Sequence, residues 1–96
     1  MLAPMAIFST TVAAPAAFPA ANAPSVEIPF APKLLTIANV DATPANYIEF
    51  SFDGVAVAGR LTPGSLPNIR LELQAATKLW LRRGAGTPNV TIIAEQ

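Results

Sequence analysis

The sequence predicts an all-β protein: a small antiparallel β-sandwich of jelly-roll-like form, or a barrel, with about six to seven strands after an extended Ala/Pro-rich N-terminal arm. From residue 33 onward, apolar side chains alternate with polar ones, which is the pattern of half-buried strands. Turn sequences separate these runs about every 8 to 12 residues. Six of the ten prolines fall within the first 32 residues, where they interrupt regular structure.

The composition excludes several classes of protein. The chain has 96 residues, a net charge of zero, 12% charged residues, and neither cysteine nor histidine. Disulfides are therefore absent, zinc, haem and iron–sulfur sites lack their usual ligands, and Ser-His-Asp and Cys-His catalytic arrangements cannot form. A neutral chain also has no basic footprint, which disfavours nucleic acid as a partner. We predict no enzyme, cofactor, metal or small-molecule substrate, and we expect association with other protein chains, because so small a core is marginal alone.

Residues 1–32 are predicted to form the arm. No charged side chain occurs between Met1 and Val26. A secretory signal is disfavoured because no basic residue follows Met1 and because Pro15 and Pro19 break the apolar run. The same breaks disfavour a membrane helix, so we expect neither secretion nor a membrane partner. Ala/Pro-rich sequence instead favours an extended backbone.

Large apolar side chains recur along the arm, although a solvated, disordered tail has little use for them. We favour an arm that lies on a neighbouring subunit, with folding back on its own domain and plain disorder as the alternatives. A boundary after residue 32 then leaves a sandwich domain over residues 33–96, and deletion of residues 2–25 should leave this domain folded. The arm residues predicted to make protein contacts are Ile7, Phe8, Val12, Phe18, Ile28 and Phe30.

The first strands after the arm can be placed by their side-chain pattern. Residues 33–40 are apolar on both faces, which predicts a central strand or one that the arm covers. Residues 47–52 show the clearest alternation and predict a half-buried strand. Asp53-Gly54 follows directly and favours a type I′ turn, so we expect a β-hairpin whose return strand is residues 55–61.

Turn sequences also mark the second half of the domain. Residues 62–65 read Thr-Pro-Gly-Ser, which predicts a type II turn with Pro63 and Gly64 at its centre. The glycine-rich stretch around residues 84–86 joins two strands and lacks the helix of a phosphate-binding loop, so we predict a hairpin loop there. The remaining predicted strands are residues 68–73, 77–83 and 89–95, with residues 26–30 as a further candidate.

Acidic residues show no catalytic spacing. Glu49 and Glu72 occupy outward positions of two predicted strands, where a carboxylate is normally solvated or paired across the sheet, here with Arg60 or Arg70. A glycosidase-type carboxylate pair would need a cleft, and no segment is available to build one. The two glutamates are therefore predicted to have surface roles.

Lys78, Trp80 and Arg82 alternate along one predicted strand and should share a face. They could form an aromatic and basic platform for a glycan or single-stranded nucleic acid. Alternatively, the tryptophan packs under the aliphatic stems of the two cations at a subunit contact. We favour the packing interpretation, because one tryptophan with two cations is a small site on a neutral chain.

Five motifs occur in succession along the domain. They are LTIANV at residues 35–40, IEFSFDGV at 48–55, LTPG at 61–64, TKLWLR at 77–82 and VTIIA at 90–94. This succession is similar to that of small β-sandwich structural proteins of tailed bacteriophages. The resemblance covers residues 35–95 and brings no catalytic residues with it. It implies a virion component that is present in many copies and bound to the capsid or tail.

The expected function follows from this resemblance together with the small core. We expect a capsid decoration or cement protein that stabilises the shell as a symmetric homo-oligomer, partnered by the major capsid protein and by copies of itself. It would be assembled in the host cytoplasm and located in the virion. A head–tail junction or tail protein is the first alternative, and a glycan- or nucleic-acid-binding β module is the second.

Overall fold

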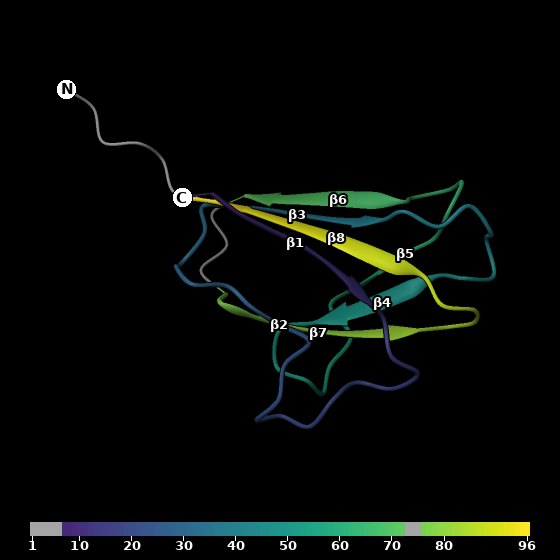
Figure 1. Ribbon diagram of the computed structural model, residues 1–96, viewed down its shortest axis with the longest axis horizontal. Coiled ribbons are helices and arrows are strands. Elements are labelled where there is room, and N and C mark those ends of the chain that lie inside the picture. Colours follow the sequence, from purple (N-terminus) through teal and green to yellow (C-terminus); the bar gives the residue numbers. More distant parts are fainter. Residues whose placement is uncertain (1–6, 73–75) are drawn as a thin grey trace.

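The computed structural model describes residues 7–72 and 76–96, and these residues form eight strands, most of which show alternating burial of their side chains (Figure 1). These residues contain no helix, and hence no helix long and apolar enough to span a membrane. The predicted all-β class is confirmed. The strands are β1 (Ile7–Ala13), β2 (Val26–Glu27), β3 (Leu34–Asn39), β4 (Ile48–Ser51), β5 (Gly59–Leu61), β6 (Asn68–Glu72), β7 (Lys78–Arg83) and β8 (Asn89–Glu95).

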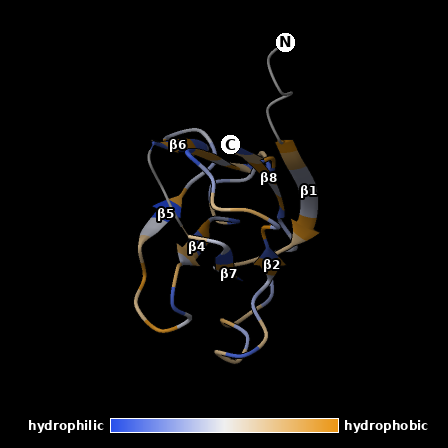
Figure 2. Cartoon of the chain, turned by 90° about the vertical axis from the view of Figure 1, so that its left-hand side faces the viewer, coloured by the Kyte–Doolittle hydropathy of each residue, from blue (hydrophilic) through white to orange (hydrophobic). Residues whose placement is uncertain are grey.

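The strands form two antiparallel sheets that pack face to face. Sheet A has the order β1-β8-β3-β6, and sheet B has the order β2-β7-β4-β5. Figure 2 shows the two layers end-on, with β6, β8 and β1 above β4, β7 and β2. The separate sheets make this fold a sandwich rather than a barrel. The central position predicted for residues 33–40 is confirmed, because β3 lies between β8 and β6.

The core lies between the sheets and is built by alternate residues of the central strands. In β8 every second residue is fully buried, as the sequence pattern predicts. Burying one such aliphatic side chain contributes roughly 1.5–3 kcal/mol, so these strands carry most of the stability of the domain. The fully buried aliphatic side chains on the inner faces are Leu35, Ile37, Ile48, Leu61, Leu79, Leu81, Val90, Ile92 and Ala94.

Two of the predicted connections differ from the structure. Gly59 pairs with Phe50, so the chain returns to the sheet five residues after Gly54 and the predicted type I′ hairpin is wrong. The cause is the Asp53 carboxylate, which accepts hydrogen bonds from Val55 N and Ala56 N at 2.8 and 2.9 Å and draws the chain into a wide loop. The loop at residues 84–86 is also no hairpin, because it joins β7 in sheet B to β8 in sheet A.

The turn at residues 62–65 is confirmed. Ser65 N donates to Thr62 O at 3.2 Å, and Gly64 has a φ of 86°, as the third residue of a type II turn requires. The alternation predicted for residues 68–73 is confirmed as far as Glu72, the end of β6, and residue 73 lies outside the described residues.

Residues 7–32 belong to the sandwich in this structure, so residue 33 does not begin a separate domain. β1 pairs with β8 along its whole length, and β2 pairs with β7. This raises the strand count from the expected six or seven to eight. The stretch between Pro4 and Pro15 contains no proline and is rich in β-branched and aromatic residues, which favours a strand. Here the segment folds back on its own domain, and residues 1–6 of the predicted arm lie outside the described residues.

Candidate functional site

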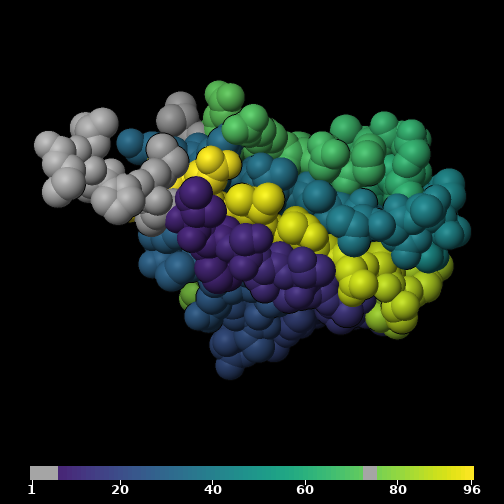
Figure 3. Space-filling view, turned by 45° about the horizontal axis from the view of Figure 1, so that its top comes forward, coloured from purple at the N-terminus to yellow at the C-terminus, as the bar shows by residue number. Residues whose placement is uncertain are grey.

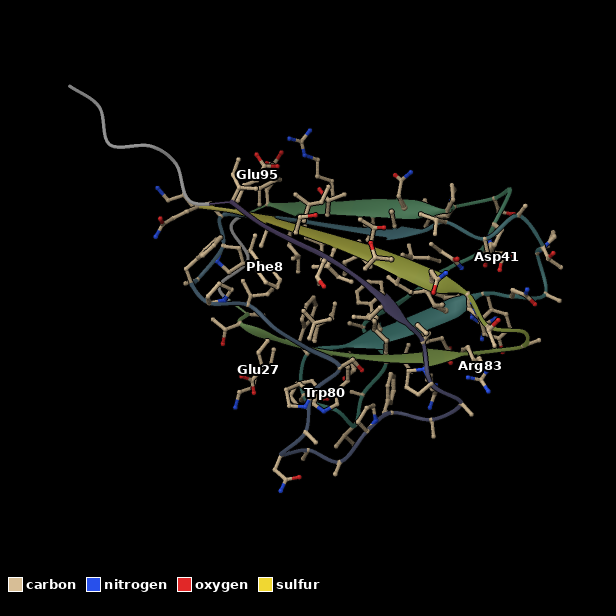
Figure 4. All side chains as sticks on the ribbon, viewed as in Figure 1. Phe8, Glu27, Asp41, Trp80, Arg83 and Glu95 are labelled. Atoms are coloured by element: carbon tan, nitrogen blue, oxygen red, sulfur yellow. The ribbon has the colours of Figure 1, made fainter. Side chains whose placement is uncertain are left out.

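Most of the apolar side chains predicted to contact a neighbouring subunit pack on the core of their own chain. Ile28 is buried, and Phe8, Val12 and Phe30 are partly buried against the core cluster. Figure 4 shows Phe8 between the two sheets. Ile7 differs, because 65% of its surface is exposed. In this structure, therefore, Ile7 alone of these five remains largely open to a partner.

Residues 14–25 run beside β7 and pass over Trp80 on the outer side of sheet B, and we call them the strap. The strap is held by hydrogen bonds to β7 at both of its ends. Arg83 N donates to Pro15 O at 2.8 Å, and the Arg83 side chain donates through Nη1 to Ala14 O at 3.1 Å. Near the other end, Leu81 N donates to Ser25 Oγ at 3.0 Å. The proline-rich segment is thus part of the sandwich. It is not extended throughout, because Ala23 N donates to Ala20 O at 2.8 Å and closes a turn there.

Trp80 lies under the strap on the outer side of sheet B (Figure 4). Its indole Nε1 donates to Ala20 O at 3.0 Å, and only 4% of the residue is exposed. Gly54 approaches the ring so closely that a Cβ there would lie 3.0 Å from Trp80 Cε2. Beside it, the Arg82 guanidinium carbon lies 4.5 Å from the centre of the Phe18 ring. The strap and the wide loop after β4 together enclose the indole.

Lys78, Trp80 and Arg82 therefore form no open stacking platform. Lys78 is exposed, Trp80 is buried and Arg82 is half-buried. The packing interpretation fits the buried ring, although the segment that covers Trp80 is the strap of the same chain and not a pair of cationic stems at a subunit contact.

Glu49 binds two arginines on the outer face of sheet B. Its Oε1 lies 2.7 Å from Arg82 Nε, and its Oε2 lies 3.1 Å from Arg60 Nη2. Burial raises the pKa of Glu49, but the hydrogen bonds and charges of Arg82 and Arg60 lower it by more, so the pKa lies below its usual value. The predicted partner Arg60 is confirmed, whereas Arg70 lies in sheet A. Glu72 is also in sheet A, so the two outward glutamates do not form a pair.

Two loop carboxylates act as caps for backbone groups. A hydrogen bond from the backbone N–H of Val55, and a second one from that of Ala56, lower the pKa of Asp53. The backbone N–H of Thr43 does the same for the pKa of Asp41. Hydrogen bonds to the charged form explain both directions. These acids therefore fix the shape of exposed loops.

The outer face of sheet A is the broadest surface built only from strands. β1, β8, β3 and β6 lie side by side across it in Figure 3. β1, β8 and β3 together carry a single charged residue, Glu95, at the end of β8. β6, at one border of the face, carries Arg70 and Glu72. Thr11 Oγ1 and Thr91 Oγ1 are hydrogen-bonded at 3.1 Å across the face. The register places the following residues at its centre: Ser9, Thr11, Thr36, Ala38, Thr91 and Ile93.

Sequence patterns alone did not identify this face as a candidate site. The sequence does show small or β-branched residues at every second position of the segments that form these strands. Only the pairing of β1 with β8, however, brings Ser9 and Thr11 beside Thr91. Within residues 7–72 and 76–96 there is no detected pocket and no group of three or more acidic residues placed to hold a metal ion.

Comparison with known proteins finds a distant structural likeness and no sequence family. No family model matches the chain, and no curated protein matches it. Among solved structures, the chain is similar to the crystal structure of Aeromonas hydrophila PliG, a periplasmic lysozyme inhibitor of g-type lysozyme. The sequence identity is 11%, the likeness covers 96% of this chain and 86% of that chain, and the TM-score is 0.48.

Proposed function

We propose that the chain is a structural protein of a tailed-bacteriophage virion, and specifically a capsid decoration or cement protein. The observation that carries this proposal is the outer face of sheet A, with its uncharged centre and charges at its border. The order of the sequence motifs supports the assignment to a virion.

This face has the composition of a protein-binding surface. Interface centres are depleted in charge, whereas their rims are polar and solvated. Here the hydroxyl groups of Ser9, Thr36 and Thr91 offer hydrogen bonds, and Ile93 and Ala38 add apolar contact area between them. A broad, shallow face suits another folded surface, such as the outside of a capsid shell, better than a small molecule, which needs a concave site.

Each alternative makes its own structural demand. A head–tail junction or tail protein would use the same face within a ring of few copies, so copy number separates it from decoration. A glycan- or nucleic-acid-binding module needs an exposed aromatic ring for stacking. The single tryptophan is 4% exposed and hydrogen-bonded to the strap, so no observation favours this module.

Quantitative mass spectrometry of purified virions tests the proposal. The ratio of this chain to the major capsid protein should give a copy number on the order of hundreds, as expected for a protein that decorates a symmetric shell. A count of about six or twelve would assign the chain to a ring at the head–tail junction or tail instead. Absence from virions that contain all other structural proteins of the phage would refute a virion function.

A further inference from the structure

The four edge strands of the sandwich differ in their protection against pairing with another chain. Sheet B ends in β2, two residues that include Glu27, and in β5, three residues that include Arg60. On one side, sheet A ends in β6, which carries Arg70 and Glu72. Short length and charge are the features by which natural edge strands avoid pairing. At the other edge of sheet A, β1 has seven residues, no charge and no proline.

β1 also presents unpaired backbone groups along its outer edge. Directly after the strand, Ala14 N donates to Pro88 O at 3.1 Å. Paired and unpaired residues alternate in an antiparallel ladder, so the backbone groups of Phe8, Thr10 and Val12 face β8. None of the groups that face away has a backbone partner among the described residues. These groups belong to Ile7, Ser9, Thr11 and Ala13.

We propose that β1 pairs antiparallel with β1 of a second copy of the chain, about a two-fold axis at Thr10. This register opposes Ser9 to Thr11 of the second copy, and Ile7 to its Ala13. All of the outward N–H and C=O groups of the strand then find partners. The strand is thus complementary to itself, as an isologous interface requires.

The side chains favour the same register. Phe8 and Val12 are only partly buried at the border of the core. In the proposed pair, Phe8 opposes Val12 of the second copy at a non-hydrogen-bonded position, where side chains approach most closely. Pairing therefore completes the burial of both residues. It also joins the outer faces of the two copies into one continuous sheet surface, because the two-fold axis is perpendicular to the sheet.

This inference deepens the proposed function by naming the surface through which copies of the chain meet, and it can be tested without virions. Light scattering on the purified full chain should give twice the mass of one chain, which is 10.0 kDa. Ser9→Pro removes an outward N–H group and leaves the β8 ladder intact, so it should halve the measured mass.

Arg70→Pro is the matched control. Asn39 N donates to Pro67 O, and by the alternation of the ladder the Arg70 N–H faces away from β3 at the opposite edge of sheet A. This variant should remain dimeric, and circular dichroism should show both variants folded. A dimer that Arg70→Pro disrupts and Ser9→Pro does not would overturn the proposal in favour of β6.

Cysteine trapping keeps the proposal testable if Ser9→Pro fails to fold. The chain has no cysteine, so Thr10→Cys introduces a single thiol on the two-fold axis. The Cα atoms of a non-hydrogen-bonded pair lie about 4.5 Å apart, within the range that a disulfide spans. Thr10→Cys should therefore cross-link faster than Arg70→Cys under mild oxidation. A monomeric wild-type chain whose two cysteine variants cross-link equally slowly would refute the pairing, even if virions contain the protein.

Discussion

The indole Nε1 of Trp80 donates a hydrogen bond to the backbone oxygen of Ala20 at 3.0 Å, which joins β7 to a residue 60 positions earlier in the chain. The proline-rich segment thereby covers Trp80 on the outer side of sheet B. A small domain buries only part of its unfolded surface, and the strap adds a third layer over its single tryptophan. Part of the additional burial that so small a domain needs is therefore supplied by the strap of the same chain.

Trp80→Phe should lower the free energy of unfolding by about 1–2 kcal/mol, because the hydrogen bond to Ala20 is lost and the smaller ring leaves a gap under the strap. Urea unfolding followed by circular dichroism measures the change. Tyr47→Phe is the control, since the Tyr47 hydroxyl makes no hydrogen bond within the described part of the chain. Equal effects of the two substitutions would contradict the role of the strap contact.

Gly54→Ala should destabilise the domain more than Gly64→Ala does. Both glycines have positive φ, 81° and 86°, so each alanine costs about 1–2 kcal/mol of backbone strain. At Gly54 the new Cβ would also lie 3.0 Å from Trp80 Cε2, whereas at Gly64 nothing lies within 4 Å. The difference between the two thermal transitions isolates the crowding against Trp80. If Gly54→Ala were no worse than Gly64→Ala, the close packing of this loop on the indole would be wrong.

Much of the fold could be predicted from the sequence, because alternation reports directly which residues face a core. The alternation of residues 47–52 and 89–95 and the turn at residues 62–65 all depend on local chemistry, and the structure contains β4, β8 and the turn there. The tight hairpin predicted at Asp53-Gly54 is wrong because the Asp53 carboxylate accepts hydrogen bonds from both Val55 N and Ala56 N. Local propensity does not reveal which of two local hydrogen-bond patterns prevails.

The candidate surfaces were harder to predict, since they depend on contacts between distant segments. β1 joins β8 across most of the chain, so Ser9 and Thr11 become part of the outer face of sheet A only after this closure. Likewise, Trp80 shares a strand face with Lys78 and Arg82 as predicted, but its burial depends on a strap at residues 14–25. A period-two pattern predicts which face of a sheet a side chain lies on, but it does not predict which segment covers that face.

Glu49→Gln should destabilise the protein at neutral pH by about 1 kcal/mol, since the exposed Arg60 makes a weak pair and Arg82 a stronger one. Because the folded state lowers the pKa of Glu49 below its ordinary 4.5, the charged pair stabilises the fold above that pH. This contribution is lost as the pH falls through the folded pKa. The difference between wild type and variant in urea unfolding should therefore shrink in acid. A difference that stays constant well below pH 4.5 would contradict this assignment.

Deletion of residues 2–25 should abolish cooperative unfolding, contrary to what an independent arm implies. The deletion removes β1 and the strap, which leaves one edge of β8 unpaired and Trp80 exposed. Thermal melts by circular dichroism, together with the tryptophan emission maximum, measure the effect. A synthetic peptide of residues 7–25 added to the truncated chain should restore the blue-shifted emission of the buried indole. A sharp transition of the truncated chain without peptide would show that residues 26–96 fold without β1 and the strap.

Thr91→Glu should reduce incorporation into virions while changing the free energy of unfolding by no more than about 1 kcal/mol. Thr91 lies at the centre of the outer face of sheet A, and its bond to Thr11 is exposed, so the fold tolerates the change. A carboxylate in a contact centre, however, must lose its hydration when the face binds another protein. Ala85→Glu adds the same charge to the exposed loop between β7 and β8 and should incorporate normally. Incorporation is measured by mass spectrometry of virions assembled with each variant, and equal loss or equal retention for both variants would show that this face is not the contact surface.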